Sequence, residues 1–391
     1  MLPSSHKLAA GERRARPGLA DIFRQYGESY RKTHCLPASH LKVMRAVEAC
    51  RTAELGGHLK QCDTCGFEHP TYNSCRNRHC PKCQSLAKAK WLEKQTSELL
   101  PVGYFHLVFT LPHLLNGLIL GHKKIFFSLL FKAVSETLLE FGRTRLKGTV
   151  GIIAVLHTWD QTLKDHFHLH CLIPAGALSV DHSRWIGARP NFLFPVKALS
   201  RVFRGKFLDL LKQAFNQGKI PPASQELKEL RKKNWVVYAK KPFGSPHTVL
   251  DYLGRYTHRV ALSNDRILAI ENGLVTLSYR DRKDGDRKKA LPLDAHEFIR
   301  RFLLHVLPDG FMRIRHFGFL ANRAKKHALP QCRKLLGLNP ALPEIPNRSA
   351  HDLLLELTGI NLKRCPRCQK GTMIVVAELP PRSGSPRWDS S

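Results

Sequence analysis

The sequence predicts an α+β fold in which helices cover an antiparallel sheet. Two segments, residues 149–174 and 260–281, show the alternating apolar residues and central turns of β-hairpins. Residues 113–147 and 195–217 are predicted to be helical instead. With 391 residues and 43% hydrophobic content, the chain can bury more than one core, so two or three domains are expected.

The N-terminal part is predicted to be helical after a basic arm. Residues 1–18 are charged and lack the apolar stretch of an export signal, which indicates a flexible arm on a cytosolic protein. Leu19, Ile22, Phe23 and Tyr26 then recur at helical spacing. A helix from about residue 85 to residue 100 and a strand within residues 101–112 follow. The longest apolar run, residues 117–134, contains His122, Lys123 and Lys124, so it is typical of a soluble helix rather than a membrane span.

A block of cysteines before residue 84 has the spacing of a zinc ribbon. Eleven cysteines in a chain without an export signal favour reduced thiols and metal ligands over disulfides. Each CxxC pair supplies two thiolates to a tetrahedral ion, so we expect one structural zinc on four residues: Cys62, Cys65, Cys80 and Cys83. The donors that alternate with them are either a second zinc site or ordinary packed side chains: Cys50, His58, Cys75 and His79. His69 is a spare donor.

A third CxxC, Cys365 to Cys368, has the form of half a zinc knuckle, but no second pair follows it. Cys332, His327 and His351 are the candidates to complete it. The remaining thiols, Cys35 and Cys171, are interpreted as packed side chains. After Leu379 the composition turns to Pro, Ser and Arg, which predicts a disordered tail over residues 379–391.

The string HFHLH in the first hairpin is a candidate metal site. Side chains alternate faces along a strand, so His166, His168 and His170 point the same way. Two neutral imidazoles at this spacing can share one divalent ion and leave other coordination positions to a third protein group, water and substrate. Two packed histidines without a metal are the alternative, and this pattern alone does not decide between them.

The string YLGRY places Tyr252 and Tyr256 four residues apart on a predicted helix, so both phenols leave the same face. A protonated phenol is a poor nucleophile and needs a metal-polarised electrophile or a nearby base. Arg255, His258 and Arg259 surround the pair and suit a phosphate substrate. The alternative is an amphipathic helix that buries two aromatic side chains.

The charge of the chain favours a nucleic acid partner. There are 63 Lys and Arg against 31 Asp and Glu, which gives a formal charge of +32 and a pI of about 10.1. There are four basic clusters, at residues 76–82, 228–235, 280–289 and 312–327. Several of them contain or adjoin aromatic side chains suited to stacking on single-stranded bases, namely Trp235, Tyr279, Phe317 and Phe319. Each cluster alone is interpreted as a solvated face, and together they indicate an extended DNA path. The candidate DNA contacts are Arg76, Arg78, Lys82, Arg255, Arg259, Arg313 and Arg315.

These motifs, in this order, resemble the two-tyrosine HUH transposases that move insertion sequences by a rolling-circle route, most closely the class numbered ninety-one, which carries an N-terminal transposase zinc-binding domain. The similarity covers most of the chain, including YNSCRNRHCPKCQ, YFHLVFTLP, HFHLHCLIPAGAL and YLGRYTHRVALSN. It implies the HUH endonuclease fold, with the histidine strand central and the tyrosine helix packed over it.

The same resemblance implies roles for the site residues. His168 and His170 would bind a catalytic magnesium or manganese ion, and Tyr252 and Tyr256 would form 5′-phosphotyrosine links to single-stranded element ends and target DNA. His157, on the preceding strand, is the first choice for a third ligand, while Asp160 and Gln161 remain open and His166 is a same-face neighbour.

The expected organisation has five parts. They are a basic arm (1–18), a helical and zinc-binding DNA-binding domain (19–100), an HUH transposase catalytic domain (101–330), a C-terminal basic region with CxxC (331–378) and a disordered tail (379–391). We expect a cytoplasmic, nucleoid-associated bacterial protein without a membrane partner.

Two other functions stay open on the sequence. One is a non-catalytic zinc-ribbon regulator that binds nucleic acid. The other is a metal-dependent hydrolytic nuclease of the replication-initiator or relaxase type. No convincing trio of carboxylates indicates a retroviral-type transposase, and no GxxxxGK indicates an ATPase.

Overall fold

The computed structural model describes residues 17–222, 224–243, 248–249, 254, 261–282, 284–345 and 347–382. Tyr252, Tyr256, Arg255 and Arg259 lie outside these ranges, as do residues 1–16 and 383–391. None of the helices within the described ranges combines the length and the apolar composition that a bilayer span requires.

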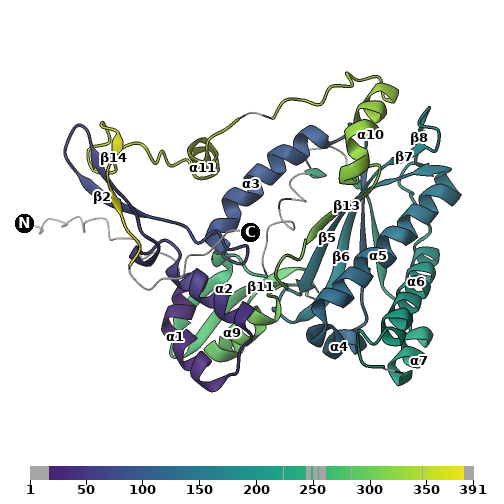
Figure 1. Ribbon diagram of the computed structural model, residues 1–391, viewed down its shortest axis with the longest axis horizontal. Coiled ribbons are helices and arrows are strands. Elements are labelled where there is room, and N and C mark those ends of the chain that lie inside the picture. Colours follow the sequence, from purple (N-terminus) through teal and green to yellow (C-terminus); the bar gives the residue numbers. More distant parts are fainter. Residues whose placement is uncertain are drawn as a thin grey trace, which may run out of the picture.

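A five-stranded antiparallel sheet forms the centre of the larger half of the molecule (Figure 1). Its order is β13 (Ile314–Gly318), β5 (Gly151–Trp159), β6 (Asp165–Pro174), β3 (Tyr104–Thr110) and β9 (Val237–Phe243). Strands β5 and β6 form the predicted hairpin, and β3 corresponds to the strand predicted within residues 101–112. The α+β class predicted from the sequence is therefore confirmed.

One face of this sheet packs on helices. Helix α5 (Lys123–Phe141) and α6 (Val196–Asn216) lie across it, with α4 (Asn116–Gly121) and α7 (Ser224–Lys232) beside them (Figure 1). Because side chains alternate along a strand, residues such as Leu107, Leu156 and Leu169 enter this core. Their neighbours in sequence therefore point to the opposite face.

The opposite face carries the histidines. At one end of it, Tyr104, Ile153 and Leu172 are buried against the C-terminal part of α3 (Pro81–Glu98) and against α10 (Asn322–Leu335). The rest of this face is open to a cleft that contains His106, His157, His168 and His170. Helix α3 begins earlier than predicted because Pro81 occupies a first-turn position, where its missing N–H costs no hydrogen bond.

A second core joins the N-terminal helices to a small sheet. Helices α1 (Leu19–Thr33), α2 (Ala38–Ala49) and α9 (Ala295–Leu304) pack on strands β10 (Ile267–Glu271), β11 (Leu274–Asp281) and β12 (Arg287–Asp294). Phe23 contacts Phe302 edge-on, with ring centroids 5.6 Å apart. The predicted turn between β10 and β11 is confirmed, since Asn272 and Gly273 both adopt positive φ, as a tight hairpin turn requires.

A third sheet joins the two ends of the chain. Strands β1 (Gly57–Cys62) and β2 (Glu68–Tyr72) form a hairpin, and β14 (Met373–Leu379) pairs with β1 on its other side. Helix α11 (Ala350–Thr358) precedes β14, and Figure 1 shows this segment returning from α10 toward β2. A further small sheet contains β4 (Gly148–Thr149), β7 (Gly176–Ser179) and β8 (Trp185–Gly187).

Candidate metal centre and nucleic-acid cleft

Three histidines converge on the open face of the central sheet. His157 pairs with His168 across β5 and β6, and His170 follows two residues later on the same face. One ring nitrogen from each lies within 4.8 Å of those of the other two. Nε2 of His168 and Nε2 of His170 are 3.0 Å apart. We call these three residues the histidine centre. Their ligand role remains a prediction.

Hydrogen bonds hold the rings in an orientation that suits a metal. Nδ1 of His168 lies 2.8 Å from the His166 carbonyl oxygen, which fixes its proton on Nδ1 and leaves Nε2 as the lone-pair donor. Nδ1 of His170 lies 2.9 Å from Nε2 of His106. When His170 donates this bond, its Nε2 is also directed inward as a lone pair.

Burial keeps His168 and His170 of the histidine centre neutral. It lowers the pKa of His168 and His170 well below the ordinary range, and the neighbouring His157 lowers both further. Burial also lowers the pKa of His106 to about 3. Neutral imidazole is the form that binds metal, so the donor set fits a divalent ion near neutral pH.

His106 was not anticipated from the sequence. It lies in the middle of the apolar strand β3, where β3 runs antiparallel to β6. A histidine inside an apolar strand was the available signal, but only the pairing of β3 with β6 shows that its ring meets His170.

The other ligand candidates have different roles. The Asp160 carboxylate accepts hydrogen bonds from the Thr162 and Lys164 backbone N–H groups, both at 2.8 Å, and so closes the β5–β6 turn. The Gln161 carbonyl accepts a bond from Arg266. His166 lies on the same face as His168, with ring centroids 4.6 Å apart, as predicted. Among the described residues, the three-histidine group contains His157 rather than any of these.

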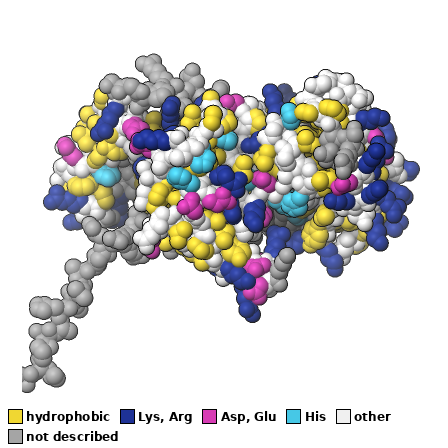
Figure 2. Space-filling model, turned by 90° about the horizontal axis from the view of Figure 1, so that it is seen from below, with side chains coloured by type: hydrophobic (Ala, Val, Ile, Leu, Met, Phe, Trp, Pro, Cys, Tyr) yellow, Lys and Arg dark blue, Asp and Glu magenta, His cyan; other side chains and the backbone are white. Residues whose placement is uncertain are grey.

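A cleft of about 990 Å³ opens over the histidine centre. The charged side chains of its wall are mainly basic: Lys233, Lys240, Arg266, Arg280 and Arg282 outnumber Asp160 and Asp281. Tyr238 of β9 lines it with 55% of its surface exposed. Figure 2 shows Lys and Arg side chains spread widely over one face of the molecule, with fewer acidic groups between them.

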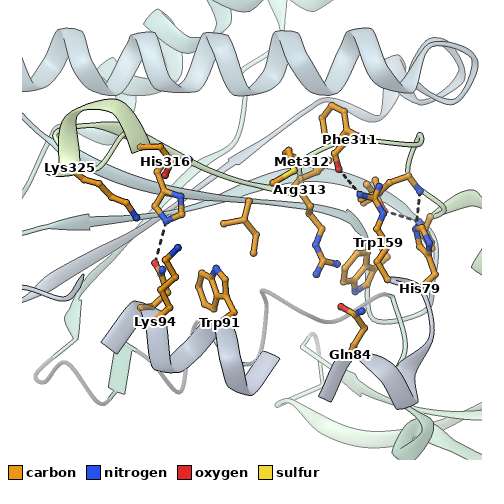
Figure 3. Close-up of a pocket in the computed structure, with 18 residues that line it drawn as sticks. His79, Gln84, Trp91, Lys94, Trp159, Phe311, Met312, Arg313, His316 and Lys325 are labelled. Atoms are coloured by element: carbon orange, nitrogen blue, oxygen red, sulfur yellow. Dashed lines mark hydrogen bonds between the residues drawn. The ribbon is translucent and has the colours of Figure 1, made fainter. Parts of the chain in front are cut away.

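A second cleft, of about 380 Å³, lies between α3 and the β13 side of the sheet (Figure 3). Trp91 and Lys94 rise from α3 toward the sheet, where His316 lies 3.3 Å from Gln95 through Nε2 and Oε1. Trp159 lines both clefts and stacks on His157, with ring centroids 4.7 Å apart. The histidine centre therefore lies beside the point where the two clefts share a wall.

The predicted DNA contacts differ in exposure. Arg76 and Lys82 are exposed. Arg78 donates to the carbonyl oxygens of Phe311 and Pro308, at 2.7 and 3.1 Å. The Arg315 guanidinium lies over the rings of Phe131 and Phe311, 4.4 and 4.8 Å from their centroids.

Arg313 is half-buried and lines the second cleft. Burial, followed by the charge of Arg78, lowers its pKa to about 10. Arg78 and Arg315 are half-buried as well, and Arg78 also lines the second cleft. A role for all three in DNA binding remains a prediction.

The structure groups the cysteines differently from the sequence prediction. Cys62 and Cys65 do not meet Cys80 and Cys83, because the β1–β2 hairpin carries the first pair away from the start of α3. Instead, one four-thiol group, the N-terminal cysteine site, contains Cys50, Cys75, Cys80 and Cys83. The neighbouring sulfurs of this group are 3.6 Å apart in three pairs.

The histidines proposed for a second zinc lie elsewhere. His79 is buried, and its Nε2 accepts a hydrogen bond from the Leu307 backbone N–H at 3.2 Å. His58 lies on β1, outside the four-thiol group. The expected set of Cys50, His58, Cys75 and His79 is therefore not brought together.

The third CxxC also has unexpected partners. Cys365 and Cys368 meet Cys62 and Cys65, and the sulfurs of Cys62 and Cys368, like those of Cys65 and Cys365, are 3.7 Å apart. Cys332 is buried on α10 in another core, and His351 hydrogen-bonds Asn361. The predicted partners Cys332, His327 and His351 are not part of this group.

Comparison with known proteins identifies the family. Residues 22–111 match the model of a "Transposase zinc-binding domain", and residues 151–328 match the model of a "Putative transposase". The chain is 48% identical to "Putative transposase y4qJ" of Sinorhizobium fredii, over 97% of this chain and 100% of that protein. The chain belongs to the insertion-sequence transposases.

A second relative refines this assignment. The transposase is 29% identical to the "Transposase for insertion sequence element IS801" of Pseudomonas savastanoi pv. phaseolicola, over 72% of this chain and 70% of that protein. No solved structure matches the transposase. The zinc-binding match contains the N-terminal cysteine site and ends long before Cys365, while the transposase match contains the histidine centre and both tyrosines.

Proposed function

We propose that this transposase cuts and rejoins single-stranded DNA at the ends of an insertion sequence through 5′-phosphotyrosine intermediates, in rolling-circle transposition. The observation that carries the proposal is the convergence of three buried histidines on an open sheet face, in a cleft lined by five Lys and Arg side chains. An open set of neutral nitrogen donors beside bound phosphates is what metal-assisted phosphoryl transfer needs.

In this proposal His157, His168 and His170 hold a magnesium or manganese ion, which would polarise the scissile phosphate and offset the charge of the transition state. The His166 carbonyl and His106 keep the His168 and His170 rings in their orientation. The basic side chains of the cleft wall bind the DNA backbone by neutralising phosphates.

The proposed nucleophiles are Tyr252 and Tyr256. The phenolic oxygen bonds to phosphorus and loses its proton, the bond from phosphorus to the 3′-oxygen breaks, and that oxygen leaves as a hydroxyl after taking up a proton. Attack of another 3′-hydroxyl on the phosphotyrosine reverses these changes and restores a phosphodiester and a free phenol. The reaction conserves one phosphoester bond, so no ATP is needed.

The described residues near Tyr252 support this assignment. Val249 is buried in the same cluster as Ile153 and Leu172, which lie on the histidine-bearing face of β5 and β6. Gly254 lies against α3, where an added Cβ would be 2.9 Å from Cε of Lys88. Both positions belong to the side of the sheet that contains the histidine centre.

The test uses single-stranded DNA carrying candidate element ends, labelled on the 3′ side of the cut, with manganese or magnesium. After denaturing electrophoresis, the proposal predicts label at the mass of the protein. This band should disappear with EDTA and in the double variant Tyr252→Phe, Tyr256→Phe. Tyr238→Phe and Tyr279→Phe are matched controls, because both tyrosines line the cleft, and each should retain the band.

The same reactions, with a binding measurement under native conditions beside them, separate the alternatives. Tight, salt-sensitive binding without any cleavage would indicate a non-catalytic regulator. Cleavage that releases a free 5′-phosphate would indicate a hydrolytic nuclease. An adduct that persists in the double variant would show that other residues are the nucleophiles.

A further inference from the structure

We infer that the transposase has a second structural zinc, held by Cys62, Cys65, Cys365 and Cys368, that fastens the C-terminal segment to the N-terminal zinc-binding domain. We call these four residues the split cysteine site. Cys62 and Cys368, whose sulfurs are neighbours, are 306 residues apart in the chain. Cys65 and Cys365 are 300 residues apart. The site thus combines a half inside the matched zinc-binding domain with a half far outside it.

The sulfur geometry fits a tetrahedral zinc. With Zn–S bonds of about 2.3 Å, tetrahedral geometry puts neighbouring sulfurs about 3.8 Å apart. The observed separations of 3.7 Å between Cys62 and Cys368 and between Cys65 and Cys365 agree with that value. All four thiols are free, and a disulfide would need a sulfur separation near 2 Å.

The two halves share two local features, a backbone N–H directed at a sulfur three residues earlier and a positive φ after the second cysteine. The Cys65 backbone N–H points at the sulfur of Cys62 at 3.5 Å, and the Gly371 N–H points at the sulfur of Cys368 at 3.4 Å. In both halves the residue after the second cysteine, Gly66 or Gln369, has positive φ, which turns the chain back beneath the sulfurs. Backbone N–H groups aimed at sulfur stabilise thiolates, the form that binds zinc.

Backbone contacts lock the halves together around the sulfurs. Asp63 and Thr372 exchange two backbone-directed hydrogen bonds, one to the Asp63 carboxylate at 2.8 Å and one between main chains at 3.1 Å. An added Cβ on Gly371 would lie 2.4 Å from the sulfur of Cys62, so only glycine allows this approach. Strand β14 then pairs with β1 from Cys62–Met373 to Gly57–Leu379.

The surrounding core is too small to explain this arrangement by packing. Its buried members are Cys62, Cys365 and Met373, with Phe67 and Cys368 partly buried beside them. Most other side chains of β14 are exposed. A module with so little apolar burial usually depends on a metal or on disulfides.

Closure of this site holds the C-terminal segment along α3. Lys325 of α10 pairs with Glu98 near the end of α3, and Arg348, just before α11, lies 3.3 Å from Glu93. The same helix contacts Gly254 through Lys88 and Leu92. The split cysteine site therefore anchors a segment that covers the helix beside the proposed nucleophile region (Figure 1).

The experiment counts zinc bound to thiolates in the full-length protein. Titration with an organomercurial releases zinc from cysteine but not from histidine, and a chromogenic chelator then measures it. We expect two zinc ions per wild-type chain and one in the double variant Cys365→Ser, Cys368→Ser. Cys332→Ser and Cys35→Ser, which change cysteines outside both sites, should retain two.

A second variant controls for loss of zinc through misfolding of the C-terminal segment. Cys62→Ser with Cys65→Ser alters the opposite end of the chain and should also leave one zinc. A single releasable zinc in the wild type would overturn the inference, as would retention of two in Cys365→Ser, Cys368→Ser. Disulfides in place of zinc would also overturn the inference. They would be detected as a loss of titratable thiols in metal-free protein that has not been treated with a reductant.

Discussion

The histidine centre and the split cysteine site are both sets of metal-type ligands, but they are assembled in opposite ways. The histidine centre is built from one hairpin, in which His157 directly faces His168. The split cysteine site needs two halves 300 residues apart or more to meet. A local site forms as soon as its hairpin forms, whereas the split site must offset the entropy of closing a long loop. Loss of ligands should therefore lower the reaction rate at the histidine centre, whereas at the cysteine sites it should disrupt folding.

The largest effect is expected at the N-terminal cysteine site. Structural zinc contributes about 10 kcal/mol or more to folding in small modules. Cys50→Ser with Cys80→Ser should therefore unfold the region where α2, the Cys75 loop and α3 meet. Hydrogen exchange should show lost protection around residues 50–83 and retained protection over β5 and β6. Cys35→Ser is the control, and equal loss of protection in both regions would contradict the separation of the two sites.

The next largest effect tests the histidine centre. His168→Ala should lower the rate of DNA adduct formation by about 1000-fold, because losing metal assistance costs several kcal/mol in the transition state. The thermal unfolding temperature should change little by comparison. His166→Ala is the matched control, since His166 lies on the same strand face and serves His168 through its backbone oxygen. Equal loss of rate in both variants would refute the proposed ligand set.

The buried histidines also make stability depend on pH. Burial lowers the pKa of His305 to about 4, against an ordinary value of 6.5. The folded state thus binds fewer protons, so the stabilisation is fully present above pH 6.5 and is lost as the pH falls toward 4. For one such residue, the loss at pH 5 is about 2 kcal/mol.

The unfolding free energy falls between pH 6.5 and pH 4, and His305→Gln should make this fall less steep. The change in slope should correspond to about one fewer proton taken up on unfolding. Urea unfolding at several pH values measures it. The neutral amide can still bond Thr158 or the Leu163 carbonyl, which His305 contacts at 3.2 and 3.1 Å. An unchanged slope would show that His305 does not titrate in this range.

A smaller effect should come from His106, which contacts the histidine centre without belonging to it. His106→Ala should weaken metal activation of DNA cleavage by about 10- to 100-fold, because His170 loses the partner that orients its ring. The metal concentration at half-maximal rate is the measurement. His106→Gln should restore part of the effect, since its carbonyl can accept the His170 N–H, and failure of any rescue would favour a packing role.

The smallest effect is expected at the cleft wall. Tyr238→Ala should weaken single-stranded DNA binding by about 5-fold, as one base loses a stacking partner worth about 1 kcal/mol. Fluorescence anisotropy at fixed salt measures the affinity. Phe192→Ala is the control, because Phe192 is 47% exposed but does not line the cleft. Equal weakening in both variants would argue against a DNA path through the cleft.

The sequence alone determined the local parts of this protein. The period of two along β6 placed His166, His168 and His170 on one face, and Asn272–Gly273 specified the β10–β11 turn. These inferences succeed because strand alternation and turn conformation depend on neighbouring residues. The α+β class followed from the same local patterns.

Only the tertiary structure decided which local parts meet. CxxC spacing marks a zinc knuckle but does not name its partner, so pairing Cys62 and Cys65 with Cys80 and Cys83 was wrong. His106 reached His170 only because β3 pairs with β6, and Arg315 reached Phe131 only because β13 packs over α5. Such contacts depend on the order of strands and on which core a segment joins, and these are properties of the whole chain rather than of any short stretch of it.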